Sequence, residues 1–338
     1  MSPDGQFIVV GVYSVKNQST GREEGRVYVF NRSGSLLWIN KPGVTGSTES
    51  SFVVDVAVSA ENQYVAVLNY YGELYYFDKN GTFLWWKGRG ESQGKNVAVS
   101  DSGYSIARGT GSHNWVDYYF NNGTSLWYFT TCNLGGSPDG HDFTGVHVAI
   151  SSDGQHVAAV SEDSRVYYFN QSGSVLWSNI TGSSLENVAM SANGNYVAAA
   201  SRDHNVYYFN ATGSRLWNFT TGNVVKSVAV NNNGTFVVAG SDDSHIYFFE
   251  RDGTLRGKYL TGAPVETVSM SRDGQMIAAG SDDQSLYCFN QSGNLIGKYT
   301  TGGKVKSVAV SGDGRYVAAG SEDGNVYVFS RDGTDNGA

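Results

Sequence analysis

Long hydrophobic runs, basic runs, cysteine and proline are all scarce in this sequence of 338 residues. No stretch approaches about 18 consecutive apolar residues, which excludes a membrane-spanning helix. No run of Lys or Arg occurs and the net charge is −8, so the basic face of a nucleic-acid binder is missing. Two Cys are too few for a disulfide-rich scaffold. With 13% aromatic and only 16% charged residues, the chain does not have the composition of a disordered protein.

Aromatic residues and glycine are abundant, with 22 Tyr, 16 Phe and 43 Gly, a composition that favours strands joined by tight turns. A Phe closes an aromatic segment at intervals of 47, 43, 49, 40, 40, 40 and 40 residues. The unit is therefore about 40 residues long, with insertions in the first half, and residues 1–338 form one repeat domain. The repeats end near Phe30, Phe77, Phe120, Phe169, Phe209, Phe249, Phe289 and Phe329.

Each unit contains four short segments of strand-like sequence. In one copy these are strand A at 187–191, strand B at 196–200, strand C at 206–209 and strand D at 215–219. Asp-Gly, Asn-Gly and Ser-Gly turns separate them, as in β-hairpins. Small Ala and Gly in strand B suit a crowded layer, while large aromatic residues in strands C and D fill a widening space. Four strands repeated radially predict an all-β β-propeller.

Two family resemblances cover the whole chain. Residues 307–329, SVAVSGDGRYVAAGSEDGNVYVF, resemble a WD-repeat blade, although Thr-Gly stands where that family has Gly-His and the Trp-Asp ending is absent. Residues 166–177, VYYFNQSGSVLW, resemble the repeat of pyrroloquinoline-quinone-type propellers, with Trp four residues after Gly. The second resemblance implies that the strand D tryptophans pack between blades. They are Trp38, Trp85, Trp127, Trp177 and Trp217, with Arg256 and Ile296 in the next two units.

The blade count follows from the strand count. Strands B and C occur eight times, while A and D occur seven times. Eight blades, the usual number in quinoprotein-type propellers, therefore fit better than seven, the alternative. The missing strands, D of blade 8 and A of blade 1, are neighbours in the ring. An upstream half-repeat of about 20–25 residues would supply both, and with it any signal peptide. Open blade edges could otherwise support self-association.

Insertions point to one face of the ring. A–B and C–D turns lie on one face of a propeller, and B–C and D–A connections lie on the other. Relative to the 40-residue unit, four connections gain 10, 7, 3 and 9 residues, all on the B–C/D–A face and all between blades 1 and 4. They cover residues 12–26, 41–52, 110–116 and 131–145. Clustered insertions favour a binding face there, with neutral loop drift as the alternative.

The inserted segments contain aromatic and polar residues of the kind found in recognition loops. Trp115 is the best candidate for an anchor, or else it covers the outer end of blade 3. The His and Asp residues, with Cys132 and His147 nearby, match no metal-site spacing, so local hydrogen bonding is the simpler interpretation. The candidate binding residues are Tyr13, His113, Trp115, Asp139, His141, Asp142 and Phe143.

Catalysis is not expected. The resemblance to quinoprotein-type propellers implies that a dehydrogenase of this kind would use a vicinal Cys pair, an active-site Asp and calcium. Cys132 and Cys288, however, are far apart in the sequence. The Asp-rich turns lack calcium-loop spacing. No G-x-S-x-G, H-E-x-x-H or phosphate loop occurs. We therefore expect no metal and no cofactor.

The predicted function is a binding or scaffold module that takes a protein or glycan partner on the B–C/D–A face. A metal- or quinone-dependent enzyme using the central channel and a structural module of a larger surface assembly are the alternatives. Ten N-x-[ST] sequons, six of them repeated C–D tips, and a composition low in Lys and Cys favour an extracellular or cell-surface location. The cytoplasm stays open as an alternative.

Overall fold

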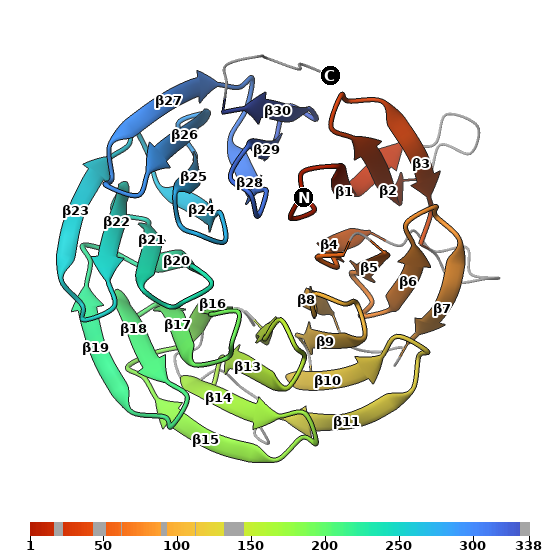
Figure 1. The fold of residues 1–338 in the computed structure, drawn as a ribbon, viewed down its shortest axis with the longest axis horizontal. Coiled ribbons are helices and arrows are strands. Elements are labelled where there is room, and N and C mark those ends of the chain that lie inside the picture. The colour runs from red at the N-terminus through yellow and green to blue at the C-terminus, as the bar shows by residue number, and fades with distance from the viewer. Residues whose placement is uncertain are drawn as a thin grey trace.

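Eight small antiparallel sheets stand side by side in a ring in the computed structural model of the protein (Figure 1). The structure describes residues 1–16, 23–42, 52–61, 63–88, 93–111, 113–131 and 145–331. Every regular element in these ranges is a β-strand. Within them no helix is long and apolar enough to cross a membrane.

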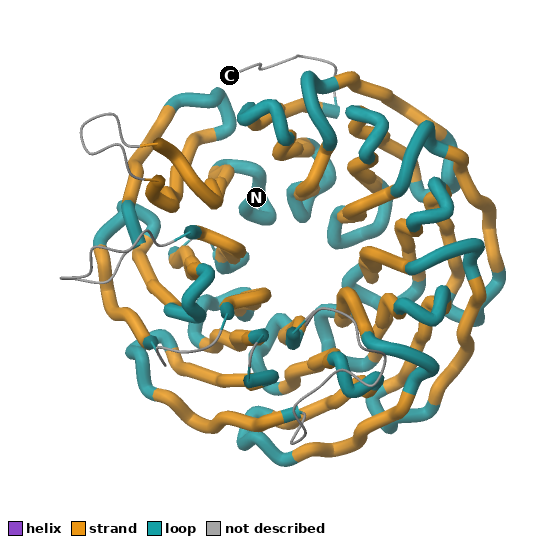
Figure 2. The backbone as a smooth tube through the Cα atoms, turned by 180° about the vertical axis from the view of Figure 1, so that it is seen from behind, coloured by secondary structure: helices purple, strands orange, loops and turns teal. Residues whose placement is uncertain are grey.

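The strands repeat in four classes from the centre of the ring to its rim (Figures 1 and 2). The innermost A strands are β4 (Val53–Val58), β8 (Gly94–Val99), β12 (His147–Ile150), β16 (Leu185–Met190), β20 (Val225–Val230), β24 (Val265–Met270) and β28 (Val305–Val310). The B strands are β1 (Phe7–Lys16), β5 (Tyr64–Asn69), β9 (Ser105–Thr110), β13 (His156–Ser161), β17 (Tyr196–Ser201), β21 (Phe236–Ser241), β25 (Met276–Ser281) and β29 (Tyr316–Ser321).

The C strands are β2 (Glu23–Asn31), β6 (Leu74–Asp78), β10 (Trp115–Phe120), β14 (Arg165–Asn170), β18 (Asn205–Asn210), β22 (His245–Glu250), β26 (Ser285–Asn290) and β30 (Val326–Ser330). The D strands at the rim are β3 (Leu36–Asn40), β7 (Phe83–Lys87), β11 (Ser125–Thr130), β15 (Val175–Ile180), β19 (Arg215–Thr220), β23 (Leu255–Leu260) and β27 (Leu295–Thr300). Blade 1 is β1–β3, blades 2 to 7 have four strands each, and blade 8 is β28–β30.

The eight-bladed propeller is therefore confirmed, with three-stranded first and last blades. Two details differ from the sequence-based prediction. The extra residues in the B–C connection of blade 1 lengthen β1 and β2 into a long hairpin, with a register shift between Val12 and Val15, instead of forming only a loop. In blade 3, Tyr119 and not Phe120 pairs in the register that Phe169 occupies in blade 4.

The core is divided among the junctions between blades. One cluster of buried apolar side chains lies at each junction, and seven of the eight contain seven to ten buried residues. Strand B is buried on both sides, which explains its small residues: a Cβ added at Gly240 would lie only 2.6 Å from Val265 Cγ1 of the next blade. Each fully buried valine contributes about 1.5–3 kcal/mol.

The strand D tryptophans lie where one blade meets the tip of the next. Trp177 Nε1 donates a hydrogen bond of 3.0 Å to Ala211 O, and its ring lies 5.6 Å from that of Phe209. Gly213, with φ of +82°, sits on the indole, because an added Cβ would be 2.7 Å from Trp177 Cγ. Arg256, at the equivalent position in blade 6, makes the corresponding hydrogen bond from Nη1 to Gln291 O at 2.8 Å. The same indole-to-carbonyl bond is made by Trp38, Trp85, Trp127 and Trp217.

Backbone hydrogen bonds between successive A–B turns tie the ring together around its opening. One bond links each turn to the next from blade 2 onward, for example Asn232 N to Arg272 O at 2.9 Å and Arg272 N to Gly312 O at 3.1 Å. The last runs from Asp313 N in blade 8 to Pro3 O in blade 1, at 3.0 Å. Pro3 stands at the position of Arg272 and has no N–H, so it accepts this bond from blade 8 but cannot itself be a donor as Arg272 is.

Candidate functional site

Four aromatic side chains from blades 1 and 2 lie together on the B–C/D–A face and are called the aromatic cluster: Tyr13, Phe52, Tyr70 and Tyr71. The lengthened β1 carries Tyr13, the residue before β4 is Phe52, and the two other tyrosines form the B–C turn of blade 2. The rings of Tyr13 and Phe52 stack at 4.6 Å and 9°. Phe52 meets Tyr70 edge-on at 6.4 Å, and Tyr70 meets Tyr71 edge-on at 5.6 Å.

Backbone and side-chain hydrogen bonds hold this cluster in place. Tyr70 N donates to Phe52 O at 2.7 Å, so the B–C turn and the D–A connection are locked together. Gln93 Nε2 donates to the Tyr70 hydroxyl at 2.7 Å. Tyr13 nevertheless remains 53% exposed. The cluster thus presents a large amphipathic ring that is already positioned, and so loses little entropy when it is covered.

A second aromatic pair lies on the same face in blade 3. The ring of His113 stacks on Trp115 at 4.5 Å and 20°. Asn114 between them adopts a left-handed φ of +51° and accepts a hydrogen bond of 2.9 Å from Thr131 N. His113 is exposed and Trp115 is half-buried. In the described part of the chain no ring contact joins this pair to the aromatic cluster.

Three of the candidate residues, Tyr13, His113 and Trp115, therefore lie on the B–C/D–A face in two separate groups. Phe52, Tyr70 and Tyr71 were missed by the sequence analysis. A signal was present for the tyrosines, because NYYG at 69–72 replaces the Ser-x-Asp turn found in most other blades. The candidates Asp139, His141, Asp142 and Phe143, and also Cys132, lie outside the described residues.

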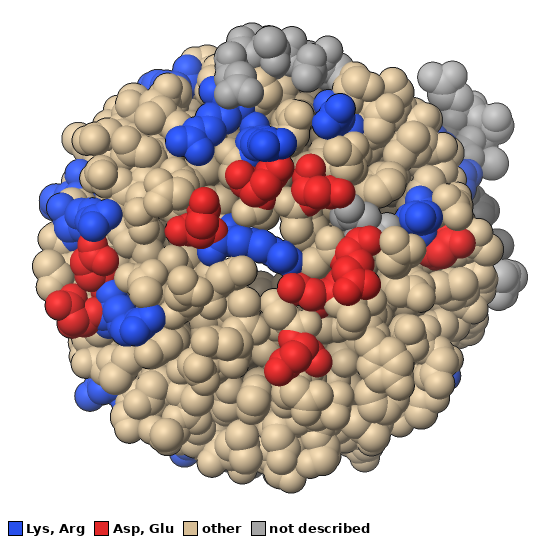
Figure 3. Space-filling model, in the orientation of Figure 1, with Lys and Arg blue, Asp and Glu red and all other residues tan. Residues whose placement is uncertain are grey.

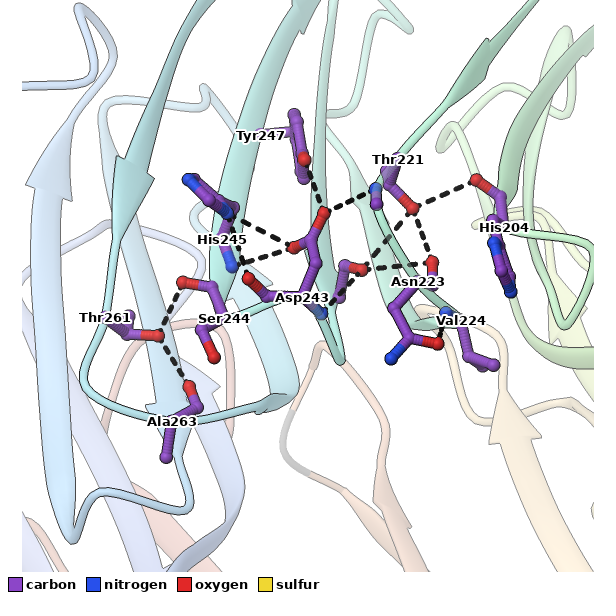
Figure 4. Close-up of polar contacts among 12 residues, drawn as sticks. His204, Thr221, Asn223, Val224, Asp243, Ser244, His245, Tyr247, Thr261 and Ala263 are labelled. Atoms are coloured by element: carbon purple, nitrogen blue, oxygen red, sulfur yellow. Dashed lines mark hydrogen bonds and ion pairs between the residues drawn. The ribbon is translucent and has the colours of Figure 1, made fainter.

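The Asp-rich B–C turns have a structural role (Figure 4). Asp243 Oδ1 accepts a hydrogen bond from His245 N at 2.9 Å, while Oδ2 accepts from the Tyr247 hydroxyl and from Gly222 N, both at 2.6 Å. Thr221 Oγ1 donates to backbone carbonyls on the other side of the same connection. The carboxylate thereby fastens the Thr-Gly connection of one blade to the B–C turn of the next. Asp203, Asp283 and Asp323 make the same bonds.

A buried ion pair in blade 3 was also missed. Arg108 and Asp117 are both fully buried, and Arg108 Nη2 lies 2.7 Å from Asp117 Oδ2. The guanidinium also donates to Gly72 O at 2.6 Å and to the Tyr119 hydroxyl at 2.8 Å, which joins blade 3 to blade 2. The equivalent pair in blade 4 is Ala159 with Tyr167, so the signal was a charged pair at two positions that are otherwise apolar or aromatic.

The A strands of blades 2 to 4 carry titratable groups next to the channel. Burial raises the pKa of Asp55 to about 6, against the opposing effect of hydrogen bonds from Val97 N, Val56 N and Asn96. Burial lowers the pKa of His147 to about 4, with a further contribution from the positive charge of Lys95. Burial also lowers the pKa of Lys95, and Glu162 and Glu186 oppose that shift. The electrostatic effect of Lys95 on His147, and of Glu162 and Glu186 on Lys95, connects groups of neighbouring blades.

The described residues include no arrangement typical of a quinone or metal centre. In the described ranges no group of three or more His, Cys, Asp and Glu side chains is arranged to hold a metal ion. Cys288 is buried within β26, and burial raises the pKa of its thiol to about 12. A thiol that keeps its proton at neutral pH is a poor ligand and nucleophile. The chain thus offers no described counterpart to the Cys pair and calcium site of quinoprotein dehydrogenases.

Comparison with known protein families shows which family the chain belongs to. The family model described as outer membrane protein assembly factor BamB matches residues 23–178 and again residues 162–334. The chain belongs to this family. The overlapping matches follow from the repeat, since two halves of one ring fit the same pattern.

Solved structures agree with this fold. Sqt1 from Chaetomium thermophilum, bound to the N-terminus of the ribosomal protein L10, superposes with a TM-score of 0.77 at 18% identity, covering 98% of this chain and 95% of that one. A second structure of the same Sqt1 gives a TM-score of 0.77 at 17% identity, covering 98% and 94%. At such identity the likeness shows the fold alone. No curated protein matches the sequence.

Proposed function

We propose that this propeller is a non-catalytic module that binds a protein partner through its B–C/D–A face, with the aromatic cluster as the anchor. The observation that carries the proposal is Tyr13, which is stacked on Phe52 at 4.6 Å yet 53% exposed. Aromatic residues dominate the centres of protein interfaces. A ring that is already packed on one side offers the other side to a partner at little cost in conformational freedom.

The relatives support a protein partner. The Sqt1 structure contains the N-terminus of a ribosomal protein, and the family is described by its part in outer membrane protein assembly. We also propose an extracellular or cell-surface location, supported by the sequons and by the Asn-, Ser-, Thr- and Gly-rich composition. A glycan remains the second class of partner, and the same experiment distinguishes it.

The test is capture of partners from a native extract by the immobilised protein and by two matched variants. Tyr13→Ala removes the exposed ring of the aromatic cluster. Tyr104→Ala is the control, because Tyr104 is 51% exposed but lies in an A–B turn on the opposite face. We expect Tyr13→Ala to lose the captured protein and Tyr104→Ala to retain it. Equal capture by the three proteins, or loss only with Tyr104→Ala, would show that the wrong face was chosen.

A different measurement distinguishes the binding module from a metal- or quinone-dependent enzyme. A metal analysis and an absorbance spectrum of the purified protein should show neither a metal nor a quinone in stoichiometric amount. Either group at one equivalent would contradict the non-catalytic assignment. Capture of oligosaccharide in place of protein by the wild type and Tyr104→Ala, but not by Tyr13→Ala, would keep the face and change the partner class.

A further inference from the structure

The sequons of this chain are concentrated on one face of the ring. A sequon, Asn-x-Ser/Thr, is the acceptor sequence for N-linked oligosaccharide. Of the nine in the described residues, two lie on D strands and seven lie on the A–B/C–D face, one in each of blades 1 to 7. The seven acceptor residues on that face are Asn31, Asn80, Asn122, Asn170, Asn210, Asn233 and Asn290. Asn17, in the tenth sequon, lies outside the described residues.

Copying of the repeat does not by itself explain this distribution. Each C–D tip is closed by a hydrogen bond from its Gly N to the carbonyl of the first turn residue, which is Asn in blades 1, 4, 5 and 7. In blades 2 and 3 another residue stands there, and the sequon begins two residues later, at Asn80 and Asn122. The tip of blade 6 begins with Glu250 and has no sequon, but the A–B turn beside it has one at Asn233, whose carbonyl accepts a hydrogen bond of 2.7 Å from Arg251 Nη2. Three different positions thus give one sequon per blade on the same face.

The turns use the amide oxygen of the acceptor Asn and leave its nitrogen available. Asn210 Oδ1 accepts hydrogen bonds from Thr212 Oγ1 at 2.7 Å and from Ser214 N at 2.9 Å, as in an Asx turn. Equivalent bonds from residues two and four positions later are accepted by Asn31, Asn170 and Asn290. Within the described structure Nδ2 of these four residues donates no hydrogen bond. The acceptors at the other two positions are exposed: Asn80, Asn122 and Asn233. Because Nδ2 is the atom that takes the sugar, these turns hold the side chain without blocking the reacting atom.

The two sequons on D strands differ from these seven in how their nitrogen is used. Asn179 is half-buried, and its Nδ2 donates a hydrogen bond of 2.7 Å to Gly213 O of the next blade. Asn218 Nδ2 donates to Asn205 Oδ1 at 3.3 Å. An oligosaccharide on Asn179 would have to enter the junction between blades 4 and 5. The same acceptor sequence therefore occurs in this chain in an available and in an obstructed setting.

Two grooves on the A–B/C–D face lie beside acceptor residues. Asn210 and Thr235, the last residue of the Asn233 sequon, line a groove of about 750 Å³ between blades 5 and 6. Asn80 lines a groove of about 510 Å³ at the equivalent place between blades 1 and 2. Each groove combines an exposed Leu, Leu216 or Leu37, with charged and amide side chains. A sugar ring has C–H groups on its faces and hydroxyls at its edge, so both kinds of surface suit the first sugar of an attached chain.

We infer that the A–B/C–D face is a modified face, with one N-linked oligosaccharide on each of blades 1 to 7. In the reaction, Asn Nδ2 attacks C1 of the first sugar of a lipid-diphosphate-linked oligosaccharide, supplied with its transferase by the cell. The N–C1 bond forms, the C1–O bond to the diphosphate breaks, the lipid diphosphate leaves and one amide proton is released. The inference rests on the extracellular or cell-surface location proposed above. The bulky, hydrated sugars cover one face and leave the B–C/D–A face to the protein partner.

The test is peptide mass spectrometry of the full chain purified from the cells that naturally make it. We expect oligosaccharide on the seven acceptor residues of the A–B/C–D face and none on Asn179. Thr212→Ala, made in the same cells, should lower the mass of the protein by one oligosaccharide, because it destroys the Asn210 sequon. Ser214→Ala is the matched control, since it removes a hydroxyl from the same turn but outside the sequon, and it should not change the number of oligosaccharides.

Several results would overturn the inference. Oligosaccharide on fewer than four of the seven residues would do so, and so would oligosaccharide on Asn179 with bare C–D tips. Retention of every oligosaccharide by Thr212→Ala would show that Asn210 is not an acceptor. Partner capture by Tyr13→Ala separates this inference from the proposed function. If the natural chain is unmodified but Tyr13→Ala still loses the partner, the inference fails and the binding face stands. If the chain is modified and Tyr13→Ala captures the partner normally, the inference stands and the binding face is wrong.

Discussion

The guanidinium of Arg272 in blade 7 lies 2.9 Å from the carboxylate of Asp101 in blade 3. These A–B turns are four blades apart in a ring of eight, so the ion pair joins opposite sides of the central opening. Figure 3, which views the A–B/C–D face, shows acidic and basic side chains gathered around that opening. Both side chains remain about 40% exposed, at 38% and 40%. Water therefore screens the pair, and the backbone bonds between turns carry the closure of this face.

This arrangement predicts weak coupling between the two residues. In a double-mutant cycle of Arg272→Ala and Asp101→Ala, the coupling energy should be below about 1 kcal/mol. It should fall further between low and high salt. Urea denaturation of the four proteins measures it. A coupling above about 2 kcal/mol would mean that the ion pair is a structural strut across the channel.

The Trp junctions predict a graded response to substitution. Trp217→Ala should cost about 2–4 kcal/mol, somewhat less than for a fully buried Trp, because the indole is only partly covered. Trp217→Phe should cost about 1 kcal/mol, since it keeps most of the packing on Phe249 but loses the bond to Arg251 O. The control is Leu216→Ala, on the exposed side of the same strand. Equal losses for Leu216→Ala and Trp217→Ala would contradict the junction role.

The buried ion pair in blade 3 predicts that replacing Arg108 alone lowers the free energy of unfolding more than replacing Arg108 and Asp117 together. Arg108→Ala alone leaves Asp117 buried without its cation and should cost about 3–5 kcal/mol. The double variant Arg108→Ala with Asp117→Tyr installs the pair that blade 4 has at these positions, Ala159 with Tyr167, and should recover most of that loss. Thermal denaturation of both variants checks this. If the double variant is no more stable than Arg108→Ala, the charges are needed by blade 3 itself, beyond their mutual pairing.

The pKa of Asp55 predicts a pH dependence of stability. Its carboxyl has a pKa of about 6 in the folded protein and about 3.9 when unfolded. Between these values the folded state holds a proton that the unfolded state has released, so this group makes stability fall as the pH rises from about 4 to 6. Asp55→Asn places at this position the residue that β8 and β16 carry, Asn96 and Asn187. This substitution removes the pH-dependent contribution of the Asp55 carboxyl to stability.

The free energy of unfolding of Asp55→Asn, measured relative to that of the wild type, should therefore increase by about 1–3 kcal/mol as the pH rises from about 4 to 7. His147 acts in the opposite sense in both proteins, because its pKa of about 4 lies below the value of about 6.5 in the unfolded chain. Urea denaturation at pH 4, 5, 6 and 7 gives the comparison. A constant difference between variant and wild type across this range would show that the Asp55 carboxyl titrates as it does in water.

The repeat made the architecture predictable, while the site was only partly predictable. Strand identity follows from period-2 patterns and turn residues within each unit, so even the three strands of the first and last blades could be counted from the sequence. The hairpin β1–β2 was taken for a loop, because length alone cannot distinguish an insertion from longer strands. Phe52 is separated from Tyr13 by 39 residues, and only their stacking in space makes them one surface. Arg108 and Asp117 were missed because polar residues in strands usually point to solvent.

The proposed function requires that the aromatic cluster on the B–C/D–A face anchors a protein partner. The most direct measurement is the Kd of the captured partner for the wild type, Tyr13→Ala and Tyr104→Ala proteins. Loss of a central aromatic anchor costs at least about 2 kcal/mol, or roughly thirtyfold in Kd. We expect that loss of affinity for Tyr13→Ala and less than a twofold change in Kd for Tyr104→Ala. An unchanged Kd for Tyr13→Ala, with or without a loss for Tyr104→Ala, would contradict the proposed function.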